Sequence, residues 1–250
     1  MTVTFALLGP VRAWRNGNEI PLGSPQQRTA LTVLLLREGL LTTVDELVDA
    51  IWPVDPPTSA VATVRTYLSR LRRLLCFQHG VRIGWIGGGY VLSAPAGSID
   101  VQLFHEYTAA ATEALRRGEH AEAAAALRAA VALHRGTPLA GAAGGYVEGQ
   151  RARLLELCQG AAVDLAAVTV ELGGYAEAIA ELRAMVAEEP LREQCHALLM
   201  TALYRSGRTA DALAHYRQVH RMLADELGVD PTPELRHLHQ RILLGATARA

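Results

Sequence analysis

Apolar and polar residues alternate along the first twenty-one positions of the chain, a period that is typical of short strands. The alternation is carried by Val3–Leu8, Val11–Trp14 and Glu19–Pro21, and the triplet Asn16-Gly17-Asn18 separates the last two. Asn-Gly is a preferred pair for a tight hairpin turn. The sequence therefore predicts an N-terminal antiparallel sheet.

The apolar spacing then changes to the helical period three times in succession. Ser24 before a proline is a favourable helix start, and Thr43 with Glu46 three residues later has the capping-box pattern. Prolines after position 52 end the second helix and precede a longer third one. The predicted helices are Pro25–Arg37, a helix from the Thr43 cap to Trp52, and Thr58–Cys76.

Two further strands are predicted after the third helix, at Val81–Ile86 and Tyr90–Ser93, joined by the glycines Gly87–Gly89. The order is thus a sheet, three helices and a closing hairpin. This is the layout of a winged helix-turn-helix module with an N-terminal sheet, an α+β fold. The sequence predicts that residues 1–97 form such a domain, followed by a linker at Pro95–Ser98.

From about Asp100 onward the chain is helical in period and rich in alanine, and part of it repeats after thirty-four residues. Each copy places a glycine between two helices, then a small residue, then a large one. The matched positions are Leu165, Gly173, Ala178 and Leu182 in one copy, and Leu199, Gly207, Ala212 and Tyr216 in the next. Thirty-four residues is the tetratricopeptide period. Residues 98–250 are therefore predicted to form an all-α, tetratricopeptide-like domain, with a generic alanine-rich bundle as the alternative.

A third copy of this repeat is arguable around Gly118, Ala123 and Leu127. It is separated from the others by an insertion, expected to be irregular, that contains Gly136 to Gly149. In either reading this half of the chain is expected to offer a protein-binding surface.

The third helix carries the main functional expectation, because its residues divide into two faces at 100° per residue. Val61, Val64, Leu68, Leu71 and Leu75 form one apolar stripe. The other face is polar and basic, and it comprises Thr63, Arg65, Thr66, Tyr67, Ser69, Arg70, Arg72 and Arg73. A helix of this kind fits the major groove of DNA, where arginine can donate two hydrogen bonds to guanine.

The distribution of charged residues along the chain supports DNA binding by the third helix, whereas the net charge does not. The chain has a net charge of −1, and all its Lys and Arg residues are arginines. Residues 1–97 carry nine arginines against six acids, while the rest carries fifteen against nineteen. No acid occurs between Asp55 and Asp100, where five arginines lie. A surface of one sign suffers self-repulsion unless a polyanion neutralises it.

Two accessory contacts are expected beside this helix. The Gly87–Gly89 loop is expected to be a wing tip, in which backbone N–H groups such as those of Gly88 and Gly89 approach phosphates or the minor groove. Arg82 and Tyr90 lie beside it, and a plain tight hairpin fits these residues equally well. Gln27 and Arg28 fall at a helix N-terminus, where the helix dipole favours phosphate. Arg28 as a surface residue without a role is the alternative.

Other function classes lack their signatures. Without lysine there is no Gly-x-x-x-x-Gly-Lys phosphate loop, and no Gly-x-Ser-x-Gly elbow occurs. The three cysteines and the scattered histidines lack metal-ligand spacing. No apolar run is long enough for a membrane span, and the N-terminus lacks a signal-peptide pattern. We therefore expect a cytoplasmic protein that is not an enzyme and needs no metal or cofactor.

Three hypotheses remain open at this point. The chain is a DNA-binding transcription activator, an adaptor whose N-terminal domain binds protein, or an enzyme with an unrecognised site. The acid-free segment separates the first two, because an adaptor has no use for uncompensated positive charge there.

Several motifs resemble the Streptomyces antibiotic regulatory protein (SARP) family, in the same order and over essentially the whole chain. They are Phe5 to Val11 (FALLGPV), Pro25 to Arg28 (PQQR), Tyr67 to Arg73 (YLSRLRR), Leu199 to Arg208, and Glu226 to Leu235 (ELGVDPTPEL). Members often have proline before the wing Gly-Tyr, whereas this chain has Gly87-Gly88-Gly89 before Tyr90.

The resemblance implies a winged-helix domain followed by a bacterial transcriptional activation domain. It also implies side-by-side binding of protomers to direct repeats in double-stranded DNA upstream of secondary-metabolite genes, and recruitment of RNA polymerase. Thr63, Thr66, Tyr67, Ser69, Arg70 and Arg73 would then lie on the recognition helix. The chain stops soon after Leu244, so a short, stand-alone member without nucleotide-hydrolysing modules is expected.

Overall fold

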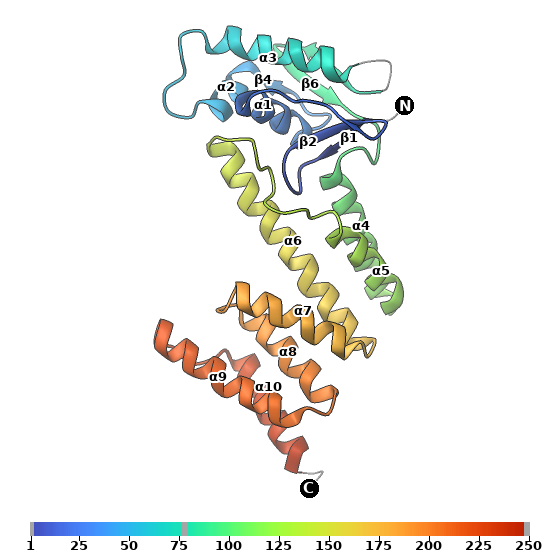
Figure 1. Cartoon of the computed structure of the whole chain (residues 1–250), viewed down its shortest axis with the longest axis vertical. Helices are drawn as coiled ribbons and strands as arrows, with labels where there is room; N and C mark the ends of the chain where they lie inside the picture. Colours follow the sequence, from blue (N-terminus) through green and yellow to red (C-terminus); the bar gives the residue numbers. More distant parts are fainter. Residues whose placement is uncertain (1–2, 77–79, 248–250) are drawn as a thin grey trace. The chain divides into compact units, whose positions relative to one another are not determined.

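The computed structural model describes residues 3–76 and 80–247 (Figure 1). The chain divides into two compact units. The first contains the residues up to Ala110 together with Arg128–Gln159, and the second contains Ala111–Leu127 and the residues from Gly160 onward. The division falls inside three helices, α4 (Asp100–Arg116), α5 (His120–Val131) and α6 (Gly145–Glu171). It therefore differs from the point at residue 97 where the character of the sequence changes.

The N-terminal sheet has the antiparallel order β1-β2-β3, with β1 at Val3–Ala6, β2 at Arg12–Arg15 and β3 at Asn18–Glu19. Asn16 and Gly17 both have positive φ, 51° and 84°, as a type I′ turn requires. The predicted hairpin turn is confirmed. The first strand is shorter than predicted, because the backbone N–H groups of the next two residues donate elsewhere.

Three helices follow, α1 (Pro25–Leu36), α2 (Val44–Ile51) and α3 (Ala60–Leu75), and α3 packs against both of the others. The Ser24 hydroxyl accepts the N–H of Gln27 at 3.3 Å and so caps α1. The predicted capping box of α2 is present, since Thr43 Oγ1 accepts from Glu46 N and the Glu46 carboxylate accepts from Thr43 N. These starts are local, which is why the sequence predicts them well.

A second sheet lies after α3, with β4 at Thr42–Thr43, β5 at Arg82–Ile86 and β6 at Gly89–Ser93, in the antiparallel order β4-β6-β5. The two-residue turn is Gly87-Gly88, and both glycines have positive φ. Gly89, predicted as loop, pairs within the sheet. A Cβ at this position would lie 2.6 Å from the Thr42 carbonyl oxygen, so only glycine fits where β4 approaches. The short strand β4 was not predicted.

Residues 135–144, predicted as part of an irregular insertion, are a packing segment of the first unit. Thr29 Oγ1 donates to Ala143 O at 2.8 Å and accepts from Ala143 N at 3.0 Å. Arg135 N and Leu139 N donate to the carbonyls of Leu8 and Leu7. The first unit therefore includes residues on both sides of the predicted boundary at residue 97, and that boundary stays a prediction.

The carboxylate of Asp100, at the start of α4, fixes the residues that follow β1. It accepts hydrogen bonds from Leu7 N at 2.8 Å and from Leu8 N at 3.0 Å. Asp100 is buried, and burial raises the pKa of its carboxyl group to about 6 despite these hydrogen bonds. A single acidic side chain thus joins segments ninety-three residues apart in sequence.

The predicted repeat is visible as three equivalent helix-turn-helix connections, including the arguable first copy. Gly118, Gly173 and Gly207 have φ of 77°, 81° and 82°, and each lies two residues before a helix begins. In each turn the glycine N–H donates three residues back and the next N–H donates five residues back. Ala123, Ala178 and Ala212, five residues after each glycine, are all buried. The same backbone turn is therefore built three times, with a small residue where the helices touch.

The second unit ends with α7 (Tyr175–Glu188), α8 (Glu193–Arg205), α9 (Thr209–Leu227) and α10 (Pro233–Thr247). Pro190 lies between α7 and α8, as the sequence predicts. Leu182, Leu199, Leu203 and Leu223 belong to the buried core that these helices share. Among the described residues, no helix combines the length and the apolar character needed to cross a membrane.

Candidate nucleic-acid interface

Helix α3 buries one face and exposes the other. Val64, Leu68, Leu71 and Leu75 are completely buried against α1, α2 and β5. Val61, predicted on the same stripe, is 40% exposed, and this prediction is wrong. Val61 lies at the edge of the stripe in the first turn of the helix, and the buried residue there is Ala60 on the other edge. The remaining stripe fixes the rotation of α3 as predicted.

The opposite face of α3 is exposed, polar and positive. Its exposed residues are Arg65, Thr66, Ser69, Arg70 and Arg73. Among the described residues none of these three arginines makes an ion pair. The Thr66 hydroxyl donates to Ala62 O at 2.9 Å, which leaves its oxygen free to accept. This face can therefore donate hydrogen bonds to an anion from several positions at once.

Two predicted residues, Thr63 and Tyr67, border this face and are half-buried. Thr63 Oγ1 donates to Ser59 O at 2.9 Å, one turn back. At the C-terminal end of α3, burial raises the pKa of the Cys76 thiol, so that this side chain adds no negative charge beside the arginines. The helix surface thus keeps a single sign of charge along its length.

Arg72 differs from the other arginines of α3 because it turns toward the hairpin. Its Nε donates to Ile83 O at 2.7 Å, and its guanidinium carbon lies 5.2 Å from the centre of the Tyr90 ring. The latter distance allows a cation–π contact. Arg72 therefore holds the β5–β6 hairpin against α3, and we assign it a positioning role.

The hairpin itself presents only part of what the sequence suggests. Arg82 and Gly88 are exposed, but Gly89 and Tyr90 are buried. The Tyr90 ring is instead a packing element that meets Trp85 edge-on at 4.9 Å. Because the strand β4 covers this end of β6, neither Gly89 nor the Tyr90 side chain is available to a phosphate.

Exposed apolar side chains at the tip of the hairpin were missed by the sequence reasoning. Trp85 is 51% exposed and Ile86 is 60% exposed, immediately before the two-glycine turn. The only available signal was the presence of two large apolar residues beside a turn, where polar residues are usual.

The N-terminal end of α1 is closed by the packing segment. Gln27 is 3% exposed, with its amide against Gly23. Arg28 is half-buried, and its guanidinium packs closely against Gly141. A Cβ added to Gly141 would lie only 2.8 Å from a guanidinium nitrogen of Arg28. The expected phosphate site at this helix end is therefore not presented by these side chains. Nothing in the sequence near this helix start indicates that residues more than a hundred positions away cover it.

Two observations concern groups that could bind a metal or act as a nucleophile in the described part of the chain. There, no three His, Cys, Asp or Glu residues are grouped so that they could hold a metal ion. Burial raises the pKa of the Cys158 thiol to about 11, the opposite of what a reactive thiolate requires.

Comparison with known proteins links both parts of the chain to one group of regulators. Residues 99–243 match the family model of the bacterial transcriptional activator domain. The chain is 47% identical to the regulatory protein AfsR of Streptomyces coelicolor over 98% of its own length, and 33% identical to the regulatory protein DnrI of Streptomyces peucetius over 95%. It spans a quarter of the length of that AfsR and 90% of DnrI.

A solved structure shows the same fold. Mycobacterium tuberculosis EmbR, determined in complex with a low-affinity phosphopeptide, matches 98% of this chain with a TM-score of 0.93 at 35% sequence identity. The match covers 65% of the EmbR chain. The similarity therefore extends through the N-terminal sheets and helices as well as the helical repeats.

Proposed function

Because the chain belongs to the Streptomyces antibiotic regulatory protein family of transcriptional regulators, we propose that it activates transcription by binding DNA in a sequence-specific manner. The genes under its control would be an antibiotic or other secondary-metabolite cluster, as the relatives suggest. The site of action would be promoter DNA in the bacterial cytoplasm.

We further propose that residues 1–97 work as a winged helix-turn-helix domain, with α3 in the major groove. Arg70 and Arg73 lie at the centre of the exposed face, where arginine can contact the O6 and N7 atoms of guanine. The proposed contact residues on α3 are Thr63, Arg65, Thr66, Tyr67, Ser69, Arg70 and Arg73. The β5–β6 hairpin would be the wing, and it would reach the DNA backbone through Arg82 and Gly88.

The observation that carries this proposal is the exposed, acid-free face of α3. Its arginines have no ion-pair partner among the described residues, and no acidic residue occurs in residues 56–99. Such a face is stabilised when the phosphates of DNA neutralise it. Gln27, Gly89 and Tyr90 are left out of the proposed contact set because they are buried, and Arg28 and Arg72 because they turn to other parts of the protein.

For the second half we propose a tetratricopeptide-like activation domain that recruits RNA polymerase. The three equivalent glycine turns support the repeat, and tetratricopeptide repeats commonly bind proteins through their helical surfaces. Binding to direct repeats would place protomers side by side on one face of the DNA, where they could also contact each other.

The test uses the full chain and duplexes from the region upstream of the genes beside its own. Footprinting locates the repeat, and fluorescence anisotropy measures affinity at several salt concentrations. Three phosphate contacts would weaken binding roughly fortyfold between 50 and 200 mM salt. Arg70→Ala should weaken specific binding by about 1–3 kcal/mol and leave the melting temperature unchanged. Binding that is insensitive to salt and to Arg70→Ala would refute the groove model.

Polymerase recruitment needs a separate measurement. In vitro transcription from the footprinted promoter should rise when the wild-type chain is added, and it should stay at the basal level with a chain that cannot bind the repeat. An unchanged transcript level in spite of a saturated footprint would refute the activator role and favour a simple DNA-binding one.

A further inference from the structure

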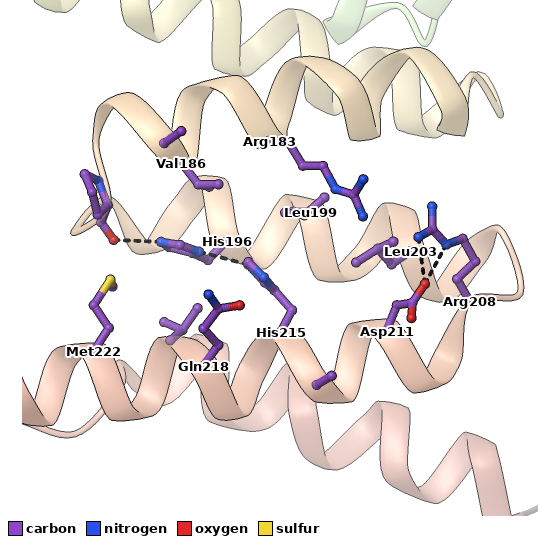
Figure 2. Close-up of a pocket in the computed structure, with 14 residues that line it drawn as sticks. Arg183, Val186, His196, Leu199, Leu203, Arg208, Asp211, His215, Gln218 and Met222 are labelled. Atoms are coloured by element: carbon purple, nitrogen blue, oxygen red, sulfur yellow. Dashed lines mark hydrogen bonds and ion pairs between the residues drawn. The ribbon is translucent and has the colours of Figure 1, made fainter.

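The second unit contains a groove whose lining residues are not used by the proposed DNA contact. It runs between α7 and α9 and has a volume of about 560 Å³ (Figure 2). Its floor is apolar and is formed by Leu199 and Leu203 of α8 with Val219 of α9. Ala187 and Ala214 leave space between the two walls. This volume is in the range of pockets that hold small molecules.

One end of the groove carries a positive charge that no acidic side chain within residues 3–76 and 80–247 neutralises. Arg208 donates to Asp211 at 2.7 Å, so this pair contributes no net charge. Figure 2 shows Arg183 extending from α7 toward α8 and α9. Among the described residues Arg183 has no ion-pair partner. The lining therefore has one unmatched guanidinium, which favours a ligand with a single negative charge.

A histidine pair supplies polarity without charge deeper in the groove. His196 Nε2 lies 2.7 Å from the carbonyl oxygen of Pro190, which can only accept, so this nitrogen carries the proton. His196 Nδ1 then accepts from His215 Nε2 at 2.9 Å. Burial lowers the pKa of both rings, that of His215 to about 4, and keeps both neutral. The remaining nitrogen of His215 is thereby left as an acceptor.

We propose that this groove binds a small organic acid, with an apolar body on Leu199, Leu203 and Val219 and its carboxylate on Arg183. The size, the apolar floor and the single unmatched positive charge together define this ligand class. The site would give the protein a small-molecule input in the helical half, separate from the DNA contact. The inference does not depend on DNA binding, and failure of either proposal leaves the other standing.

The test measures binding of hexanoate, octanoate and 4-phenylbutyrate to the full chain by isothermal titration calorimetry. The alcohols 1-octanol and 4-phenyl-1-butanol are the uncharged controls. We expect saturable binding of at least one acid in a 1:1 ratio, and at least tenfold weaker binding of the matching alcohol, because a charged hydrogen bond is lost. Failure of all three acids to bind, or equal binding of acid and alcohol, would overturn the proposal.

Variants locate the site. Arg183→Gln should weaken binding of the acid about tenfold, whereas Arg221→Gln, an exposed arginine of α9 that does not line the groove, should leave it unchanged. Ala214→Trp fills the groove from an exposed position and should abolish binding, with Ala224→Trp on the same helix as its control.

Circular dichroism checks that each variant is folded. Equal losses in a variant and its control would place the acid elsewhere and overturn the assignment. Binding of a peptide through its free C-terminal carboxylate, with no binding of the acids, would equally overturn it and make the groove a protein contact.

Discussion

Three arginines on α3 and three arginines in the second compact unit differ in whether an acidic side chain lies within ion-pair distance. In the second unit, Arg205 lies 2.8 Å from Glu171, Arg208 lies 2.7 Å from Asp211, and Arg116 lies 3.2 Å from Glu113. Arg65, Arg70 and Arg73 of α3 have no such neighbour among the described residues. Arginine is the only Lys or Arg residue type in both regions. The contrast therefore comes from the distribution of the acidic residues, which are missing between Asp55 and Asp100.

This difference shows that the location of the unpaired charges is a better guide to a binding surface than the net charge is. Exposed Arg–Glu pairs contribute little stability, but they remove local repulsion. A helix face with three unpaired arginines keeps its repulsion until an external anion binds. Arg116, Arg205 and Arg208 are neutralised by neighbouring acids of the same unit, while Arg65, Arg70 and Arg73 leave the same task to a partner.

The largest effect is expected on DNA affinity when the unpaired arginines of α3 are replaced. Replacing Arg65, Arg70 and Arg73 together with glutamine should weaken DNA binding about a thousandfold, or roughly 4 kcal/mol, because three phosphate or base contacts are lost. The slope of log affinity against log salt should fall by about 1 for each of these arginines that neutralises a phosphate. Anisotropy titrations at several salt concentrations measure both quantities. An unchanged slope would mean that α3 does not face the phosphates.

A buried acid gives the next largest effect, this time on stability. The folded protein raises the pKa of Asp100 to about 6 from an ordinary value near 3.8, so it holds the proton more tightly than the unfolded chain does. The free energy of unfolding should therefore fall as the pH rises from about 4 to about 6, by about 3 kcal/mol for this group.

Urea denaturation at several pH values measures this dependence, which Asp100→Asn should largely remove. A carboxyl resonance of Asp100 that titrates near pH 4 in an NMR experiment on the wild type would contradict the prediction, even if the variant fails to fold.

Substitution of Arg72 extends the comparison to two arginines of α3, one that holds the hairpin and one that is exposed. Because it holds Ile83 and Tyr90, Arg72→Ala should lower the free energy of unfolding by about 1–2 kcal/mol. It should change the salt slope of DNA binding less than Arg70→Ala does. Thermal denaturation and anisotropy on the two variants separate the roles. If Arg72→Ala leaves stability intact and reduces the salt slope as much as Arg70→Ala, then Arg72 is a DNA contact and not a positioning residue.

The smallest effect is expected from a paired arginine of the second unit. Arg205→Gln removes an exposed ion pair with Glu171 and should cost less than about 1 kcal/mol of stability. DNA affinity should stay within twofold of the wild type. A loss comparable to that of Arg70→Ala would show that unpaired charge is a poor guide to the DNA contact.

Features with a local cause were predicted well from the sequence. The Asn16-Gly17 turn, the Thr43–Glu46 capping box and the glycine turns depend on residues a few positions apart. The apolar stripe of α3 is also local, because helical geometry alone decides which side chains share a face. Val61 was the exception, since a residue at the edge of a stripe is buried only if a neighbour reaches it.

Some residues predicted to contact DNA are instead buried, or turned into the protein, by segments that lie far away along the chain. Gln27 and Arg28 lie at a helix start that would suit a phosphate, but the segment near Gly141 and Ala143 packs there. Tyr90 is buried because β4 pairs with β6. Neither contact leaves a mark in the sequence beside these residues, because each partner lies far away along the chain.

By itself, the sequence determined the order of the elements, the two faces of α3, the absence of acids between residues 55 and 100, and the repeated turns. All of these follow from spacing and composition. The tertiary structure alone decided that Arg70 and Arg73 are presented while Arg72 and Tyr90 hold the hairpin, and that Asp100 fixes the end of β1. It also decided that Arg183 lines a groove and, in the part of the chain that the structure describes, has no acidic partner. The physical reason is that burial and pairing depend on segments brought together by folding, whereas helical period and turn chemistry do not.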